Sequence, residues 1–186
     1  MVSRGDWIVG ETAHAPSDRF DARVRVLPSE DRPLRHWTPV HLHQGAEDVG
    51  ARVATLEGRA IPVGETGLVQ IVLDKPIGAL HGDRFILRDQ SARRTVGGGM
   101  VIDPFSPARG RAKPERLAMV RGLEQQDPAA ALEAVLEHSP GGVDLNRFAV
   151  GRNLTPDEAE AVWRDADMVK VGRPQRPMGL ARAMRF

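Results

Sequence analysis

Apolar and polar residues alternate along much of the first part of the chain, between residues 19 and 104. In residues 20–26, every second side chain is apolar and the intervening ones are charged. A period of two places one set of side chains in a core and the other in water, as in a half-buried β-strand. Turn-forming residues separate the segments, so a closed antiparallel barrel or a β-sandwich is predicted. About six strands are predicted, at residues 20–26, 40–43, 51–55, 69–73, 85–87 and 95–102.

The last of these segments contains three consecutive glycines, Gly97–Gly99. Glycine weakens a strand because it has no side chain to pack and loses much backbone freedom on folding. The run therefore predicts a β-bulge or a place where another backbone approaches closely. Because no helix is predicted directly after it, we do not interpret the run as a nucleotide-binding loop.

From residue 114 onward, the apolar spacing becomes that of α-helices. Proline or a capping residue marks each predicted helix start, and Thr155 forms a capping box with Glu158. The predicted starts are Pro114, Asp127, Asp144 and Thr155. The first helix is assigned to a linker region, residues 105–126.

A short strand is predicted at residues 168–172, after the last helix. Three short helices followed by a strand are typical of a winged-helix module, which we place at residues 127–172. The helix predicted at residues 155–166 would be its recognition helix. It carries four acidic residues and one arginine, a charge pattern that would repel phosphates, so a spacer or protein-contact role is favoured over DNA reading.

Both ends of the chain are predicted to lie outside the two folded parts. Residues 1–18 are interpreted as the end of a preceding β domain and a linker, with a strand at residues 7–9. Residues 173–186 contain four arginines and no acidic residue, and we interpret them as a disordered basic tail.

Composition narrows the possible functions. The formal net charge is only +1, so nucleic-acid binding would depend on local basic patches. The absence of cysteine excludes disulfides, thiolate zinc sites and a thiol nucleophile. No apolar run approaches the about 20 residues that a membrane-spanning helix needs. We therefore expect a cytoplasmic monomer that has no membrane partner.

Three histidines, His36, His41 and His43, invite a metal-site interpretation. Two rings in a His-x-His pair lie on one face of a strand, about 7 Å apart. No cysteine and no committed carboxylate joins them, so solvent-facing strand residues are the favoured interpretation and no metal is expected. No catalytic constellation stands out and no phosphate-binding loop motif occurs, so no enzymatic activity is expected in this chain.

Residues 74–99 contain a Lys-Pro turn, an Arg-Phe strand and an Arg-Thr-Val-Gly strand. This stretch resembles the end of the third domain of translational GTPases of the elongation factor Tu type, which is a β-barrel. Residues 34–43 and the helical residues 142–156 are similar to the selenocysteine-specific branch of that family. Residues 4–7 resemble the last strand of the preceding domain.

The resemblance implies a function for the barrel. In the family, the third domain holds the T stem of an aminoacyl-tRNA, which is recognition of shape and phosphates. We expect Lys75, Arg88, Arg93 and Arg94 to lie on or beside adjacent strand ends. Lys75, Asp89 and Gln90 match family positions that approach the tRNA backbone. The complete set of implied RNA-binding residues is Lys75, Arg88, Asp89, Gln90, Ser91, Arg93 and Arg94.

The resemblance also implies partners and cofactors. The expected partner is selenocysteinyl-tRNA, with the ribosome and an mRNA hairpin contacted through other domains of the family. GTP and magnesium belong to the family's GTPase domain, so no cofactor is expected in this chain. Two alternatives remain open: a structural or interaction piece whose winged helix is a spacer, and a nucleic-acid-binding winged-helix regulator.

Overall fold

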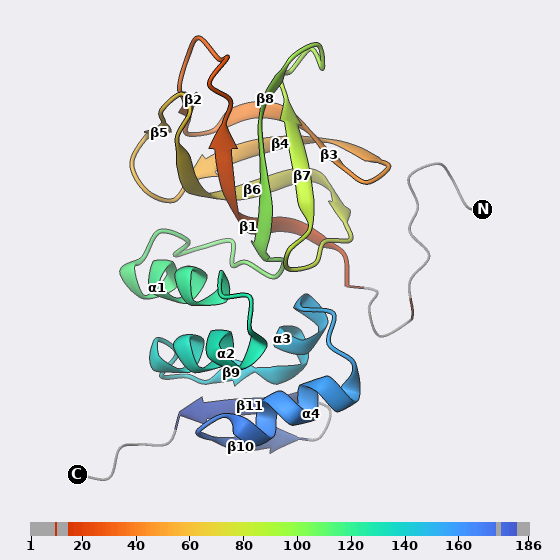
Figure 1. Cartoon of the computed structure of the whole chain (residues 1–186), viewed down its shortest axis with the longest axis vertical. Coiled ribbons are helices and arrows are strands. Elements are labelled where there is room, and N and C mark those ends of the chain that lie inside the picture. Colours follow the sequence, from red (N-terminus) through yellow and green to blue (C-terminus); the bar gives the residue numbers. More distant parts are fainter. Residues whose placement is uncertain (1–9, 11–14, 174–175, 182–186) are drawn as a thin grey trace. The chain divides into compact units, whose positions relative to one another are not determined.

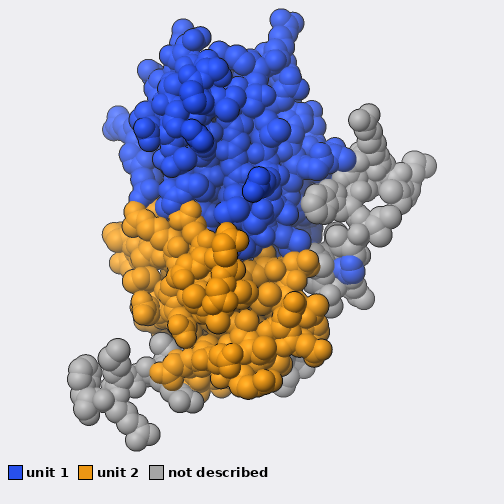
Figure 2. All heavy atoms as spheres, in the orientation of Figure 1, with its two compact units in different colours: residues 1–111 blue, residues 112–186 orange. Residues whose placement is uncertain are grey.

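The computed structural model describes residues 10, 15–173 and 176–181 (Figure 1). The chain divides into two compact units, residues 1–111 and residues 112–186 (Figure 2). Among the residues that the structure describes, no helix has the length and apolar composition needed to span a lipid bilayer. The strand predicted at residues 7–9 lies outside the described residues.

The first unit is a closed antiparallel barrel of six strands in the order β1-β6-β4-β3-β7-β8, so the predicted barrel is confirmed. Its first strand begins three residues earlier than predicted, because Ser17 already pairs with Ile77. The strands are β1 (Ser17–Val26), β3 (Thr38–Gln44), β4 (Glu47–Thr55), β6 (Thr66–Ile77), β7 (Arg84–Arg88) and β8 (Thr95–Asp103). Two further strands, β2 (Leu34–Arg35) and β5 (Ala60–Ile61), pair with each other.

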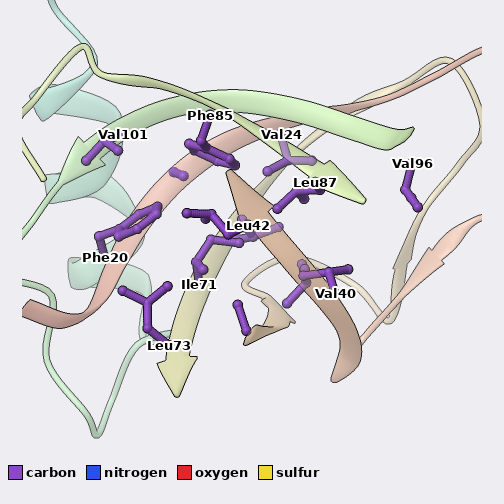
Figure 3. Packing of buried hydrophobic residues seen from close by; sticks show 14 of the residues in the cluster. Phe20, Val24, Val40, Leu42, Ile71, Leu73, Phe85, Leu87, Val96 and Val101 are labelled. Atoms are coloured by element: carbon purple, nitrogen blue, oxygen red, sulfur yellow. The ribbon is translucent and has the colours of Figure 1, made fainter. Parts of the chain in front are cut away.

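The inward-facing side chains of these strands form one apolar core (Figure 3). The rings of Phe20 and Phe85 pack against each other within it, with centroids 5.5 Å apart and planes inclined by 60°. Leu42, Ile71 and Leu87 are fully buried around them. Burial of each such side chain contributes about 1.5–3 kcal/mol, and the alternation seen in the sequence places them all on one side of the sheet.

The three glycines of β8 lie where neighbouring backbones approach closely, as predicted. A Cβ atom added at Gly98 would lie 2.8 Å from the carbonyl oxygen of Phe85 in β7. A Cβ atom at Gly97 or Gly99 would overlap a carbonyl oxygen of β1. Strand β8 closes the barrel between β1 and β7, so the missing side chains allow this closure.

The segment after β8 lies on the outer surface of the barrel, although we predicted it as linker from residue 105. Gln70 lies between two core residues of β6, so its side chain points outward. Its Nε2 atom lies 3.2 Å from Ser106 Oγ and 3.1 Å from the carbonyl oxygen of Pro107. Gln70 and Ser106 are both buried. The segment therefore forms part of the first unit, which extends to residue 111.

The second unit contains four helices and a small sheet: α1 (Pro114–Leu123), α2 (Pro128–Glu137), α3 (Leu145–Gly151), α4 (Pro156–Asp165), β9 (Val143–Asp144), β10 (Met168–Arg173) and β11 (Arg176–Ala181). The helices begin where the capping residues predict. Asp127 caps α2, Asp144 caps α3, and Thr155 with Glu158 forms the predicted capping box of α4.

Helix α1 belongs to this helical unit and not to a linker. Its Met119 and Leu123 pack against the core formed by α2, α3 and β10. Within α1, Val120 and Gly122 are buried, and the contacts of the helix with α2 and α3 are tertiary, so the local spacing of its apolar residues did not indicate to which unit it belongs.

The prediction that residues 173–186 form a disordered tail is wrong for residues 176–181, which form β11. This strand pairs with β10 on one side and with β9 on the other, in the order β10-β11-β9. A Cβ atom at Gly179 would meet Met168 Sδ at 2.7 Å, so a glycine fits this position beside the helical core. Tertiary pairing thus overrides the weak strand preference of the local sequence. Residues 174–175 and 182–186 lie outside the described residues.

Candidate nucleic-acid interface

Six of the seven predicted RNA-binding residues lie in or beside one loop, residues 89–94, which projects from one end of the barrel between β7 and β8 (Figure 1). Asp89 organises this loop. Its Oδ1 atom accepts hydrogen bonds from the backbone N–H groups of Arg93 (2.8 Å) and Arg94 (3.2 Å), and its Oδ2 atom accepts one from Ser91 Oγ (2.9 Å). The backbone N–H groups of Arg94 and Arg93 lower the pKa of Asp89. Both carboxylate oxygens thus shape the loop.

The basic side chains of the loop differ in how far their charge is compensated. Arg94 lies 3.4 Å from a carboxylate oxygen of Glu30 and 3.8 Å from one of Asp31. Arg93 is exposed, and within the described ranges neither Arg93 nor Arg88 has an ion-pair partner. Arg93 is therefore an exposed cation of the loop whose charge is not paired with a carboxylate of the described residues.

The seventh residue, Lys75, lies at the opposite end of the barrel. In β3, His41 pairs with Arg88 at the end of β7, and Gln44 pairs with Glu47 at the start of β4. Strand β3 therefore runs from the end of the barrel with the 89–94 loop to the end with Glu47. The Lys75 Nζ atom lies 2.9 Å from Glu47 Oε2. The expectation that Lys75 shares adjacent strand ends with the loop arginines is therefore wrong.

Comparison with known proteins places this barrel in a family. Residues 21–108 match the sequence model of the beta-barrel domain of the selenocysteine-specific elongation factor. The chain is 34% identical over 173 residues to the selenocysteine-specific elongation factor of Escherichia coli, covering 92% of this chain. It is 33% identical over 104 residues (56% of the chain) to the factor of Desulfomicrobium baculatum and 27% identical over 139 residues (74%) to that of Haemophilus influenzae.

The chain belongs to the selenocysteine-specific elongation factor family. It spans 26%, 16% and 22% of the lengths of these three relatives, in the same order. An alignment of 173 residues is longer than the barrel unit, so the similarity to the Escherichia coli factor extends into the helical unit.

The helical unit of this family member presents an acidic surface on α4. Its four acidic residues are exposed, and one of them, Glu160, accepts hydrogen bonds from Lys170 Nζ at 3.0 and 3.1 Å. Glu158 is engaged in the capping box, where its Oε2 atom accepts from the Thr155 N–H group, and this bond lowers its pKa. Arg164 is the one basic side chain of the helix.

The three histidines that invited a metal interpretation do not converge. His41 Nδ1 and His43 Nε2 lie 3.1 and 3.8 Å from the same Asp48 oxygen, whereas His36 Nδ1 lies 3.1 Å from Thr55 Oγ1. In the part of the chain that the structure describes, no group of three or more His, Asp and Glu side chains has the arrangement of a metal site.

One exposed group beside these histidines was missed by the sequence analysis. Trp37 is 43% exposed, although the chain has few aromatic residues. The guanidinium groups of Arg111 and Arg52 lie 5.6 and 6.0 Å from the centroid of its ring. A tryptophan shortly before a predicted strand was the available signal, but only the structure brings Arg111 to it.

Proposed function

We propose that the barrel binds selenocysteinyl-tRNA through the end that carries the 89–94 loop, as part of selenocysteine-specific elongation. The names of the relatives assign elongation to proteins more than three times as long as this chain, and tRNA binding is the part of that function that we propose for it. The observation that carries the proposal is the Asp89-organised loop with Arg93 and Gln90 exposed.

The physical argument concerns phosphates and shape. A rigid barrel end with accessible guanidinium, amide and hydroxyl groups suits the backbone of an A-form RNA helix, whose deep groove hides its base edges. Because Asp89 holds the loop backbone, Gln90, Ser91 and Arg93 are presented in one conformation and less freedom is lost on binding. Arg88 extends the basic surface along β7, and Arg94 joins it if RNA phosphates replace its acidic partners.

The test is a titration of the chain with a selenocysteine tRNA transcript at several salt concentrations. Arg93→Ala is expected to weaken binding and to lower the slope of log K against log salt by about one unit. The matched control is Arg84→Ala, which changes an exposed arginine at the other end of the same strand. Equal affinities and slopes for both variants and the unaltered chain would contradict the proposal.

Lys75→Ala tests how far the interface extends. We expect a smaller effect than that of Arg93→Ala, because Lys75 lies at the opposite end of the barrel and its charge is paired with Glu47. An effect as large as that of Arg93→Ala would show that the RNA lies along the length of the barrel.

The acidic surface of α4 favours a second role, for the helical unit, as a spacer that does not read nucleic acid. Phosphates would meet more carboxylates than basic groups on that helix. Arg164→Ala removes its one basic side chain and is expected to leave tRNA affinity unchanged. A clear loss of affinity in this variant would instead place RNA on the helical unit.

A further inference from the structure

Trp37 lies in a cluster of planar and cationic side chains on the surface of the barrel unit. The ring of His36 lies alongside the indole, with centroids 6.0 Å apart and planes inclined by 28°. Arg111 and Arg52 approach the same indole ring at 5.6 and 6.0 Å. We call these four residues, His36, Trp37, Arg52 and Arg111, the Trp37 patch.

Backbone contacts fix the position of the Trp37 patch. The Trp37 N–H group donates to the carbonyl oxygen of Val53 at 2.7 Å, and the His36 N–H group donates to that of Arg59 at 2.8 Å. Trp37 has a φ of 68°, a left-handed conformation that is rare for a bulky residue. Such a conformation costs about 1–3 kcal/mol, and it places a large ring where nearly half of it faces solvent.

The side chains of the patch are also positioned by hydrogen bonds. His36 Nδ1 lies 3.1 Å from Thr55 Oγ1, whose own proton goes to the carbonyl oxygen of Gly58. His36 therefore donates from Nδ1. Arg111 donates to Gln70 Oε1 at 3.4 Å. The buried Gln70 amide, which also contacts Ser106 and Pro107, therefore helps to orient Arg111 towards Trp37.

The charge around the patch is not compensated. Arg35 directly precedes His36, and the backbone carbonyl oxygen of Arg59 accepts a hydrogen bond from the His36 N–H group. Within the described ranges, no ion-pair partner occurs for Arg35 or Arg59, nor for the two arginines of the patch. Glu57, in the turn before Arg59, is the one acidic residue in these segments. Lys75 and Arg94, by contrast, are paired with carboxylates.

We propose that the Trp37 patch binds an unpaired nucleobase of an RNA, with the indole stacked on the base and the arginines on the flanking phosphates. An aromatic face bordered by guanidinium groups suits single-stranded RNA, because each base presents a π face for stacking and each phosphodiester linkage carries a negative charge. The inference rests on the proposed function in taking RNA as the partner, but it concerns different residues and a different recognition mode.

The patch lies at the same end of the barrel as the 89–94 loop. Trp37 directly precedes β3, and His41 of β3 lies opposite Arg88, the last residue of β7, so residues 38–40 of β3 extend beyond the end of β7 towards the 89–94 loop. One RNA with a helical stem and an adjoining unpaired nucleotide therefore has two different surfaces available at this end. The loop would contact the phosphates of the stem and the patch would hold the base.

The experiment compares a 12-nucleotide single-stranded RNA with a fully paired RNA duplex of the same length, each titrated with the whole chain. Trp37→Leu, which keeps apolar bulk but removes the π face, is expected to weaken single-strand binding about fivefold or more. Duplex binding should change less than twofold. Trp37→Phe should retain most of the single-strand affinity, and Trp163→Phe, in the helical unit, is the matched control.

Arg52→Gln provides a second variant that leaves the left-handed position untouched, in case Trp37→Leu does not fold. It is expected to weaken single-strand binding severalfold and to lower its salt dependence. Unchanged single-strand affinity in Trp37→Leu and Arg52→Gln would overturn the inference, as would an equal loss for the duplex. A Trp37-dependent affinity for a polyglutamate peptide that matches the affinity for RNA would also overturn it, in favour of an acidic protein segment.

The tRNA-binding role of the 89–94 loop and the base-binding role of the Trp37 patch can each be contradicted without affecting the other. If Arg93→Ala weakens tRNA binding but Trp37→Leu leaves single-strand binding unchanged, the proposed function stands and the patch is not a base-binding site. If Trp37→Leu acts on the single strand and Arg93→Ala has no effect on tRNA, the patch binds RNA but the loop does not.

Discussion

Gln70 Nε2 donates a hydrogen bond to Asp21 Oδ1 over 3.0 Å. Both side chains are completely buried, although they lie outside the barrel core, on the outward-facing side of the strands. The same amide group contacts Ser106 and Pro107, so it ties three separate parts of the chain together. Buried polar groups are tolerated only when they are hydrogen-bonded. The 104–111 segment thus completes a network that the barrel strands alone would leave open.

Gln70→Ala is expected to lower the free energy of unfolding by about 2–3 kcal/mol, because it removes this amide and leaves its buried partners without it. The measurement is urea denaturation of the whole chain. Trypsin should also cleave faster after Arg109 and Arg111, since the 104–111 segment is released. Gln90→Ala, an exposed glutamine of the same unit, should change neither quantity; equal behaviour of the two variants would contradict the role of Gln70.

Gly99→Ala is expected to destabilise the barrel by more than about 2 kcal/mol. The added methyl group would overlap the carbonyl oxygen of Arg23 and lie 2.9 Å from Phe85 Cζ in the core. The control is Gly78→Ala, because no atom lies within 4 Å of a Cβ added there. That variant should remain within about 0.5 kcal/mol of the unaltered chain in denaturation experiments. A tolerated alanine at position 99 would show that β8 can move away from β1.

Arg152→Ala is expected to destabilise the helical unit by about 2–3 kcal/mol. The Nη2 atom of Arg152 donates to the carbonyl oxygens of Leu123 (2.8 Å), the last residue of α1, and Gln125 (2.9 Å), in the segment that follows the helix. Burial lowers the pKa of Arg152 to about 10, so the side chain remains charged at neutral pH. Thermal unfolding followed by circular dichroism would measure the loss.

Arg152→Lys should restore only part of this stability, because an ammonium group cannot reproduce the planar fork of donors. Arg164→Ala, an exposed arginine of the same unit, is the control and should have little effect. Full stability in Arg152→Lys would mean that charge alone, without donor geometry, accounts for the contribution.

Asp83 and Asp89 are expected to give opposite pH dependences of stability in the acid range. Burial raises the pKa of Asp83, whose Oδ2 atom accepts from Gln44 Nε2 and the Leu80 N–H group. The folded state then binds the proton more tightly than the unfolded state. The contribution of Asp83 to the free energy of unfolding therefore falls as the pH rises from about 4 through the raised pKa.

Asp89 has the opposite sign because its pKa is lowered by backbone hydrogen bonds. Its contribution is present above the ordinary pKa of about 4 and is lost as the pH falls through the lowered value. Urea denaturation between pH 3 and 6 should show the stability difference between the unaltered chain and Asp83→Asn decreasing with pH. The same difference for Asp89→Asn should increase, and slopes of the same sign would refute these assignments.

The sequence predicts those features of the fold that depend on local spacing. Alternation in residues 20–26 is sufficient to identify β1, and the capping box of Thr155 and Glu158 marks the start of α4, because both signals involve residues within a few positions of each other. Strand β11 could not be predicted in this way. Its pairing with β10 and β9 and the fit of Gly179 beside Met168 depend on distant parts of the unit.

The candidate site was predictable only in part for the same reason. The residues of the 89–94 loop are contiguous, so sequence proximity keeps them together. Lys75 and Arg88 are only 13 positions apart, but they lie at opposite ends of the barrel, because each lies near the C-terminal end of its strand and β6 and β7 run in opposite directions. The Trp37 patch joins residues 37 and 111 through a buried network that no local pattern reveals.

Closure of the six-stranded sheet limits the ways in which the barrel can associate with other molecules. Each of these six strands is paired on both sides, so their backbone N–H and C=O groups offer no open edge to an incoming peptide strand. A partner of this part of the barrel must be bound by outward-facing side chains and by connecting loops. Selection among partners is therefore a property of a small number of surface residues, which can change while the strands that support them remain the same.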